Sequence, residues 1–131
     1  MKTAERNYKA EIVSCSKELS KPERISIKDT SDATPIDQVL DSVPDTFFVI
    51  DVAYYAEIGV HNEAAKGDKD YSIYIIVDKN GTKYCTSSTS FFDSFMDIAS
   101  EMDGDDFSVK VFRKPSKNYN GKYFISCSIS L

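Results

Sequence analysis

The chain of 131 residues has little of what cross-links, metal sites and membrane spans require. Its three cysteines, Cys15, Cys85 and Cys127, are odd in number and far apart, so neither a disulfide framework nor a zinc site is predicted. No apolar run reaches the roughly 18 residues of a membrane-spanning helix, and the first residues, MKTAERNYKA, lack a signal-peptide pattern. We therefore expect a cytoplasmic protein with reduced thiols.

Tryptophan is absent, and histidine occurs once, as His61. This residue falls in a polar stretch that contains glycine and asparagine. No serine–histidine–aspartate set, phosphate-binding loop or metal-ligand spacing accompanies it. The sequence therefore predicts a protein that is not an enzyme and that carries no metal or cofactor.

The formal net charge of −5 argues by itself against a nucleic-acid partner. The charges are nevertheless segregated along the chain. Residues 90–106 hold only acidic charges: Asp93, Asp97, Glu101, Asp103, Asp105 and Asp106. Residues 107–122 hold only basic charges: Lys110, Arg113, Lys114, Lys117 and Lys122. Two adjacent elements of opposite sign indicate two surfaces with different roles.

Residues 1–45 are interpreted as an extension that packs on the domain formed by residues 46–131. Tyr8–Cys15 fits either a strand or a short helical turn. The alternation in Arg24–Lys28 predicts a short strand. A helix is predicted over residues 35–43, with Thr34 as its N-cap and Pro44 as its stop.

From residue 47 the apolar pattern has the period of a strand. In the predicted strand 47–58 every even position is apolar, which indicates one buried face. A polar loop over residues 59–70 leads to a strand at 71–78, whose inward residues are predicted to be Tyr71, Ile73, Ile75 and Val77. Asn80-Gly81 predicts a type I′ hairpin turn into a third strand at 82–87.

Helical spacing of Phe91, Phe95, Ile98 and Met102 predicts a helix over residues 91–102. Ser90 is its expected cap, with Asp93 completing a pattern that resembles a capping box, and Gly104 ends it. A strand at 107–113, a basic loop at 114–121 and a strand at 122–129 follow. The inward residues of the last strand are predicted to be Tyr123, Ile125, Cys127 and Ile129.

The order β-β-β-α-β-β is that of an OB-fold, so we predict a mainly β protein with a five-stranded barrel plugged by the helix. A small α+β sheet with another closure is the structural alternative. An OB barrel binds ligands across its second and third strands, between two flanking loops. Here those loops are residues 59–70 and 114–121.

Single-stranded nucleic acid is bound by cations that neutralise phosphates and by aromatic rings on which bases stack. The predicted outward strand positions and the basic loop supply both kinds of side chain. The candidates are Tyr55, Tyr74, Lys83, Lys110, Phe112, Lys114, Lys117, Tyr119, Lys122 and Phe124. The alternative is that the rings cover a second core and that the lysines are ordinary solvated residues.

Residues 46–130 resemble a known family. The segments that carry the resemblance are FFVIDVAYY, YSIYIIVDKNGTKYCTSS, FFDSFMDI and FSVKVFRKPSKNYNGKYFISCSI. They are similar to the small single-stranded DNA-binding proteins of bacteriophages and mobile elements of Gram-positive bacteria. The resemblance implies a role in DNA replication or recombination in the cytoplasm of a bacterial host.

The same resemblance implicates Lys83 and Tyr84 on the third strand. It further implicates a set around the last hairpin, namely Lys110, Lys114, Lys117, Lys122 and Tyr123. It would admit a replication or host protein and a second copy of the chain as partners besides single-stranded DNA. Two features depart from the family: many members end in an acidic tail where this chain has ISCSISL, and residues 1–45 lie outside the similarity.

A second function fits the sequence. The acidic helix region, residues 90–106, would serve as the interface of a protein-interaction module, such as a phage-encoded inhibitor of a host factor. The net negative charge favours this alternative.

Overall fold

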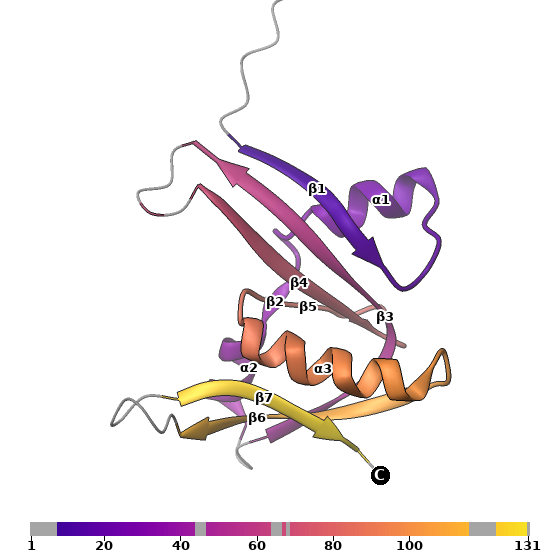
Figure 1. The fold of residues 1–131 in the computed structure, drawn as a ribbon, viewed down its shortest axis with the longest axis vertical. Coiled ribbons are helices and arrows are strands. Elements are labelled where there is room, and N and C mark those ends of the chain that lie inside the picture. The colour runs from indigo at the N-terminus through magenta and orange to yellow at the C-terminus, as the bar shows by residue number, and fades with distance from the viewer. Residues whose placement is uncertain (1–7, 44–46, 64–66, 68, 116–122, 131) are drawn as a thin grey trace, which may run out of the picture.

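The computed structural model describes residues 8–43, 47–63, 67, 69–115 and 123–130, and within them the protein is mainly β. The described chain forms seven strands and three helices (Figure 1). They are β1 Tyr8–Cys15, α1 Lys21–Lys28, β2 Thr34–Pro35, α2 Ile36–Ser42, β3 Phe47–Asn62, β4 Asp70–Asp78, β5 Lys83–Thr86, α3 Thr89–Met102, β6 Phe107–Pro115 and β7 Tyr123–Ile129. None of these helices is both long and apolar enough to cross a bilayer.

The long strand β3 connects the two halves of a curled sheet (Figure 1). Its first half pairs antiparallel with β6, and its second half lies between β4 and β1. The strand order is β2-β5-β4-β3-β6-β7, with β1 added beside β3. Two of the seven strands come from the N-terminal extension, so the sheet is larger than the five strands expected.

A β-bulge at Ala53 divides β3 into segments that face different cores. Val52 pairs with Asp78 and Tyr54 pairs with the adjacent Val77, so Ala53 is an extra residue in the ladder. An extra residue reverses which alternate positions face each side of the sheet. The even positions before the bulge therefore enter one core and those after it enter another. The single buried face predicted for residues 47–58 is wrong for this reason.

Helix α3 fills the first core with Phe91, Phe95 and Ala99. The predicted helix is confirmed, but its cap is Ser88 rather than Ser90: the Ser88 Oγ accepts a hydrogen bond from the backbone N–H of Phe91 (3.2 Å). Ser90 instead donates to the carbonyl oxygen of Ile125 on β7 (3.3 Å). The predicted stop holds, since Asp103 and Gly104 both have positive φ angles.

Helix α1 covers the second core, where a strand was predicted over residues 24–28. The sequence Ser20-Lys21-Pro22-Glu23 forms a capping box: the Ser20 Oγ accepts from the Glu23 N–H (3.3 Å), and Glu23 accepts from the Ser20 N–H (3.0 Å). Proline in the first turn suits the same helix start. These local bonds outweigh the two-residue alternation of Ile25 and Ile27 that indicated a strand.

The remaining segments of the extension join the sheet. Tyr8–Cys15 is a strand and pairs with β3, which settles the ambiguity left by its sequence. Thr34 does not cap α2, because Thr34 and Pro35 form β2 and pair in parallel with β5. Pro35 occupies the N-cap position without a side-chain hydrogen bond, and α2 ends at Ser42.

The predicted strand boundaries and inward positions need three corrections. β3 continues to Asn62 and β4 begins at Asp70, so both ends of the loop predicted at 59–70 belong to strands. At the β4–β5 turn only Gly81 of the pair Asn80-Gly81 has a positive φ, so the turn is not type I′. The positions predicted to point inward at strand ends are exposed: Tyr71, Tyr123 and Ile129.

Helix α1 offers a matched pair of isoleucines for testing whether the extension belongs to the folding unit. Ile27 is 1% exposed and packs against β3 and β4, whereas Ile25 is 70% exposed. We expect Ile27→Ala to lower the free energy of unfolding by about 2–5 kcal/mol, because it leaves a cavity between α1 and the sheet. Ile25→Ala should change it by less than about 0.5 kcal/mol in the same urea titration. Equal effects would contradict this role for α1.

Candidate functional site

The tyrosines predicted to point outward from the central strands point into the first core. Tyr74 is 7% exposed and stacks on Phe92 of α3, with ring centroids 4.1 Å apart and planes inclined by 10°. Tyr55 meets Phe95 edge-on at 4.9 Å. Both faces of β3 and β4 are covered here, so strand alternation could not distinguish a buried from an exposed side. The ring of Tyr74 therefore offers no face on which a base could stack, and Tyr55 is half-buried.

Of the two candidates on β5, Lys83 binds the N-terminal extension and Tyr84 packs against the first core. The Nζ of Lys83 donates to the carbonyl oxygens of Ser26 (2.7 Å) and Asp29 (3.0 Å) and pairs with Asp32 (2.9 Å). Only 10% of the Lys83 side chain is exposed. A cation at the C-terminal end of α1 complements its dipole and its unpaired carbonyls. Tyr84 packs against Phe48 with ring centroids 5.6 Å apart.

The C-terminal half of the outer face of β4 is therefore not open for binding. Ile75 and Val77 on this face are buried against Ile27 of α1. Lys83, at the edge of the same region, is already bound to the end of that helix. The N-terminal extension thus covers part of the surface across the second and third predicted barrel strands.

The candidates of the last hairpin lie together on an open surface. In β6 the side chains alternate: Val109 and Val111 are buried, while Lys110 and Lys114 are exposed. Cross-strand partners lie on the same side of a sheet. Pairing therefore groups five side chains, called the hairpin face from here on: Phe47 of β3, Lys110, Phe112 and Lys114 of β6, and Phe124 of β7.

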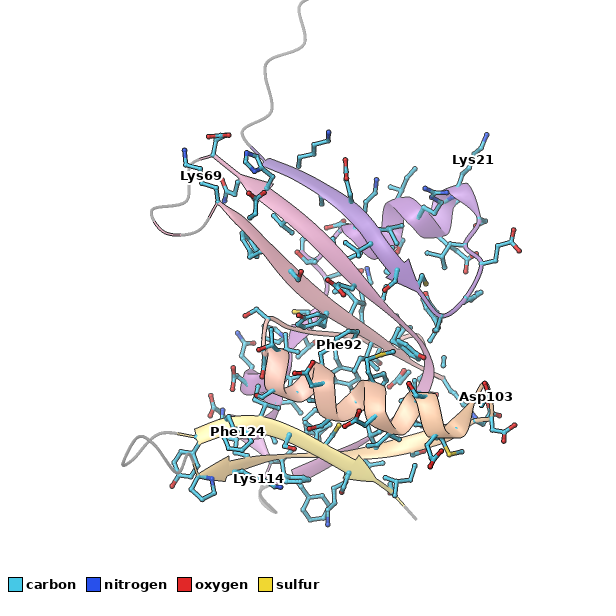
Figure 2. All side chains as sticks on the ribbon, viewed as in Figure 1. Lys21, Lys69, Phe92, Asp103, Lys114 and Phe124 are labelled. Carbon is cyan, nitrogen blue, oxygen red and sulfur yellow. The ribbon has the colours of Figure 1, made fainter. Side chains whose placement is uncertain are left out.

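Cations and rings alternate within the hairpin face. The Nζ of Lys110 lies 4.7 Å from the ring centroid of Phe47, and that of Lys114 lies 5.8 Å from the ring of Phe112. A hollow of about 410 Å³ opens between Phe47, Phe112 and Ser128. Figure 2 shows Lys114 and Phe124 beside each other at one end of the hairpin. The arrangement presents two positive charges next to exposed apolar rings.

The two lysines of the hairpin face differ from their neighbour Arg113. Neither Lys110 nor Lys114 forms an ion pair within the described part of the chain. Arg113 is held by two carboxylates of α2, Asp37 (3.1 Å) and Asp41 (2.9 Å). The free cations of the strand are therefore the two lysines.

The sequence predicted four of the five side chains of the hairpin face. The prediction did not include Phe47, although this residue alternates with the half-buried Phe48 and so was expected on the other face of the strand. Tyr123, implicated by the resemblance, is 65% exposed beside Phe124 rather than inward. Lys117, Tyr119 and Lys122 lie outside the described residues, so their roles stay predictions.

The acidic charges of α3 form a row on the solvent side of the helix. Asp93, Asp97 and Glu101 recur every four residues and are exposed. None of the three takes part in an ion pair among the described residues, whereas Asp106 beyond the helix pairs with Lys79 (3.3 Å). The row carries negative charge that the rest of the described chain does not neutralise.

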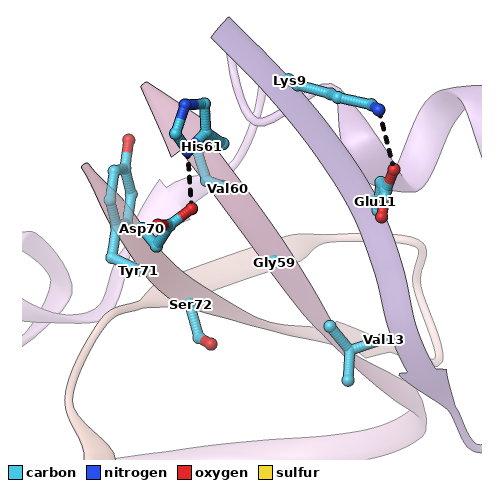
Figure 3. Close-up of a pocket in the computed structure, with 9 residues that line it drawn as sticks. All are labelled: Lys9, Glu11, Val13, Gly59, Val60, His61, Asp70, Tyr71 and Ser72. Carbon is cyan, nitrogen blue, oxygen red and sulfur yellow. Dashed lines mark hydrogen bonds and ion pairs between the residues drawn. The ribbon is translucent and has the colours of Figure 1, made fainter. Parts of the chain in front are cut away.

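His61 lies at the loop end of the β3–β4 hairpin, where Figure 3 shows its bond to Asp70. Its Nδ1 is 2.6 Å from Asp70 and its Nε2 is 2.6 Å from Glu63, which also binds Lys69 (2.9 Å). These bonds, first to Glu63 and then to Asp70, raise the pKa of His61 above its ordinary value. The group stabilises the charged imidazole and fastens the end of the hairpin.

The three cysteines are free thiols, and burial raises the pKa of Cys127 to about 12. Among the described residues no group of histidine, cysteine and carboxylate side chains is arranged to hold a metal ion. Comparisons with protein-family models, curated proteins and solved structures find no match to this chain. The candidate site is therefore argued from its own geometry.

The single histidine makes the Glu63–His61–Asp70 cluster testable by NMR. The folded pKa of His61 is raised, so its contribution to stability is present below its unfolded pKa of about 6.5 and is lost as pH rises through the folded value. We expect Glu63→Gln and Asp70→Asn each to lower the His61 pKa. A titration of the ring proton signals measures this. An unchanged pKa in both variants would contradict the two contacts.

Proposed function

We propose that this protein is a non-enzymatic single-stranded DNA-binding protein and that DNA binds on the hairpin face. The observation that carries the proposal is the pairing of Lys110 and Lys114, which form no ion pairs among the described residues, with exposed phenylalanine rings on one sheet surface. Phosphates require cations, and unstacked bases require aromatic faces. The basic segment 116–122 follows directly on this surface in the sequence.

Single-stranded nucleic acid fits these side chains better than duplex does. Phe47 and Phe124 are each more than a third exposed and present rings on which an unpaired base can stack. In a duplex the bases are already stacked and paired, and their faces are inaccessible to such rings. The resemblance of residues 46–130 to phage and mobile-element proteins supports DNA as the ligand and replication or recombination as the setting.

We further infer that residues 46–131 form an OB-like barrel. The order β3-β4-β5-α3-β6-β7 matches the β-β-β-α-β-β pattern, and β3 pairs with both β4 and β6 as a long first strand must. The sheet differs in one respect: β5 pairs with β2 of the extension, and the described pairings do not join β5 to β7. Binding on the last hairpin instead of on strands two and three follows from the position of the extension.

Fluorescence anisotropy with labelled oligo-dT tests the DNA proposal. Lys110→Gln and Lys114→Gln should each weaken binding and reduce the slope of log affinity against log salt by about 0.7, because each lysine releases one counterion. Phe124→Ala should cost about 1–3 kcal/mol of binding free energy through lost stacking.

Matched controls lie elsewhere on the chain. Lys21 is an exposed lysine on α1, and Tyr71 is an aromatic residue on β4 as exposed as Phe124. Lys21→Gln and Tyr71→Ala should leave oligo-dT affinity within twofold of the unmodified protein. This limit corresponds to a change in binding free energy of about 0.4 kcal/mol. Absence of binding at low salt, or binding that does not depend on salt, would refute the proposal.

The acidic row of α3 supports a second candidate function, that of a protein-interaction module in a bacterial host. Its three carboxylates are exposed without ion-pair partners in the described chain, as an interface for a basic partner requires. A pull-down from host extract with Asp93→Asn, Asp97→Asn and Glu101→Gln combined tests it. Loss of a captured protein favours this function, and unchanged capture counts against it.

A further inference from the structure

Two surfaces of this chain carry unneutralised charge of opposite sign. The acidic row of α3, Asp93, Asp97 and Glu101, forms no ion pair among the described residues. Lys110 and Lys114 of the hairpin face likewise form none among the described residues, and each lies over a phenylalanine ring. Some other exposed charges are paired, as Lys17 is with Glu23, whereas the exposed Lys21 and Arg24 of α1 form no ion pair among the described residues either. The two sets are complementary in charge, and the basic one lies beside exposed rings.

The two surfaces cannot meet within one copy of the chain. Val109 and Val111 point from β6 into the core that contains Phe91 and Phe95 of α3. Lys110 lies between these valines in the strand, so it points to the opposite side of the sheet. The acidic row in turn lies on the face of α3 that is turned away from that core. Any contact between the two sets must therefore join separate molecules.

The spacing of the charges is similar on the two surfaces. Asp93 and Glu101 are eight residues apart on a helix, which corresponds to about 12 Å along its axis. Lys110 and Lys114 are four residues apart on a strand, which corresponds to about 13 Å. A helix laid along β6 can therefore place one carboxylate near each lysine at the same time. The rings of Phe47 and Phe112 give the helix an apolar surface between them.

We propose that the hairpin face binds the acidic row of α3 of a second copy of this chain. Each copy has one surface of each kind, so the contact is head-to-tail and leaves a free surface at both ends of a pair. Further copies can add at these ends. The same face is the proposed DNA site, so a bound strand displaces the helix. The association itself requires no DNA.

Sedimentation velocity of the full chain tests the association without DNA. Near 50 mM salt we expect a weight-average mass that rises with protein concentration, and near 0.5 M salt a monomer, because the pairs are exposed and screened within about 3–10 Å. A monomer at low salt up to the limit of solubility would overturn the proposal.

Charge exchange identifies the two surfaces. A helix variant carries Asp93→Lys, Asp97→Lys and Glu101→Lys, and a hairpin variant carries Lys110→Glu and Lys114→Glu. Each alone should associate at least about tenfold more weakly, since like charges then face each other. A mixture of the two variants should associate. The basic hairpin face of the helix variant can bind the acidic row of the hairpin variant, and the basic row of the helix variant can bind the acidic face of the hairpin variant.

A control variant with Lys9→Glu and Lys21→Glu makes the same change in net charge as the hairpin variant, away from both surfaces, and should associate as the unmodified chain does. Circular dichroism and thermal melting confirm that each variant is folded. Failure of the mixture to associate, with both variants folded, would overturn the proposal. If oligo-dT does not bind but the mixture associates, the DNA proposal fails and the self-association stands.

Discussion

The bulge at Ala53 is the constraint on which the arrangement of this protein depends. It allows one long strand to present alternate side chains to α3 before the bulge and to α1 after it. Because β3 pairs with β6 at one end and with β1 and β4 at the other, both halves of the sheet are positioned by this one strand. A β3 without the extra residue would turn either Ile50 or Ile58 toward the wrong side.

The second core determines which surfaces remain available for binding. Ile27 of α1 is packed against Ile58 and Ile75, and Lys83 binds the carbonyl oxygens at the end of α1. Burial of this apolar surface is favourable by roughly 1.5–3 kcal/mol for each large side chain. The strand surface that α1 covers therefore stabilises the fold and is not available to a ligand. Open surface with cations and rings is left on the opposite half of the sheet, along β6 and β7.

The electrostatic character of the chain follows from this division. The acidic row of α3 and the two lysines of the hairpin face belong to neighbouring stretches of sequence, yet they point to opposite sides of the same sheet. Neither set is neutralised within the described chain. Surface charges left unpaired in this way cost little in water, so they are compatible with stability and available for a partner. DNA binding and self-association would use the same cations. The two ligands would therefore compete for the hairpin face, and one protein could still have both activities.

Local features of the sequence determined much of the secondary structure. The spacing of Phe91, Phe95 and Ile98 is sufficient for α3, and strong β alternation is sufficient for β3, β4, β6 and β7. The capping box formed by Ser20 and Glu23 is also a local signal in the sequence, but the alternation of Ile25 and Ile27 favoured a strand instead. The outward lysines of the last hairpin followed from the same two-residue period. Each of these features depends on contacts between residues close in the chain.

Tertiary structure alone decided which candidates are exposed. Tyr74 and Lys83 occupy positions that a two-layer barrel would present to solvent, but α3 covers the first and α1 binds the second. The bulge at Ala53 and the return of residues 8–42 onto the sheet depend on pairings between residues tens of positions apart, which no local period encodes. The sequence by itself therefore determined the elements and their charge. Only long-range packing decided which side of the sheet carries the proposed binding surface, because the burial of a side chain depends on its own strand and on the element that covers it.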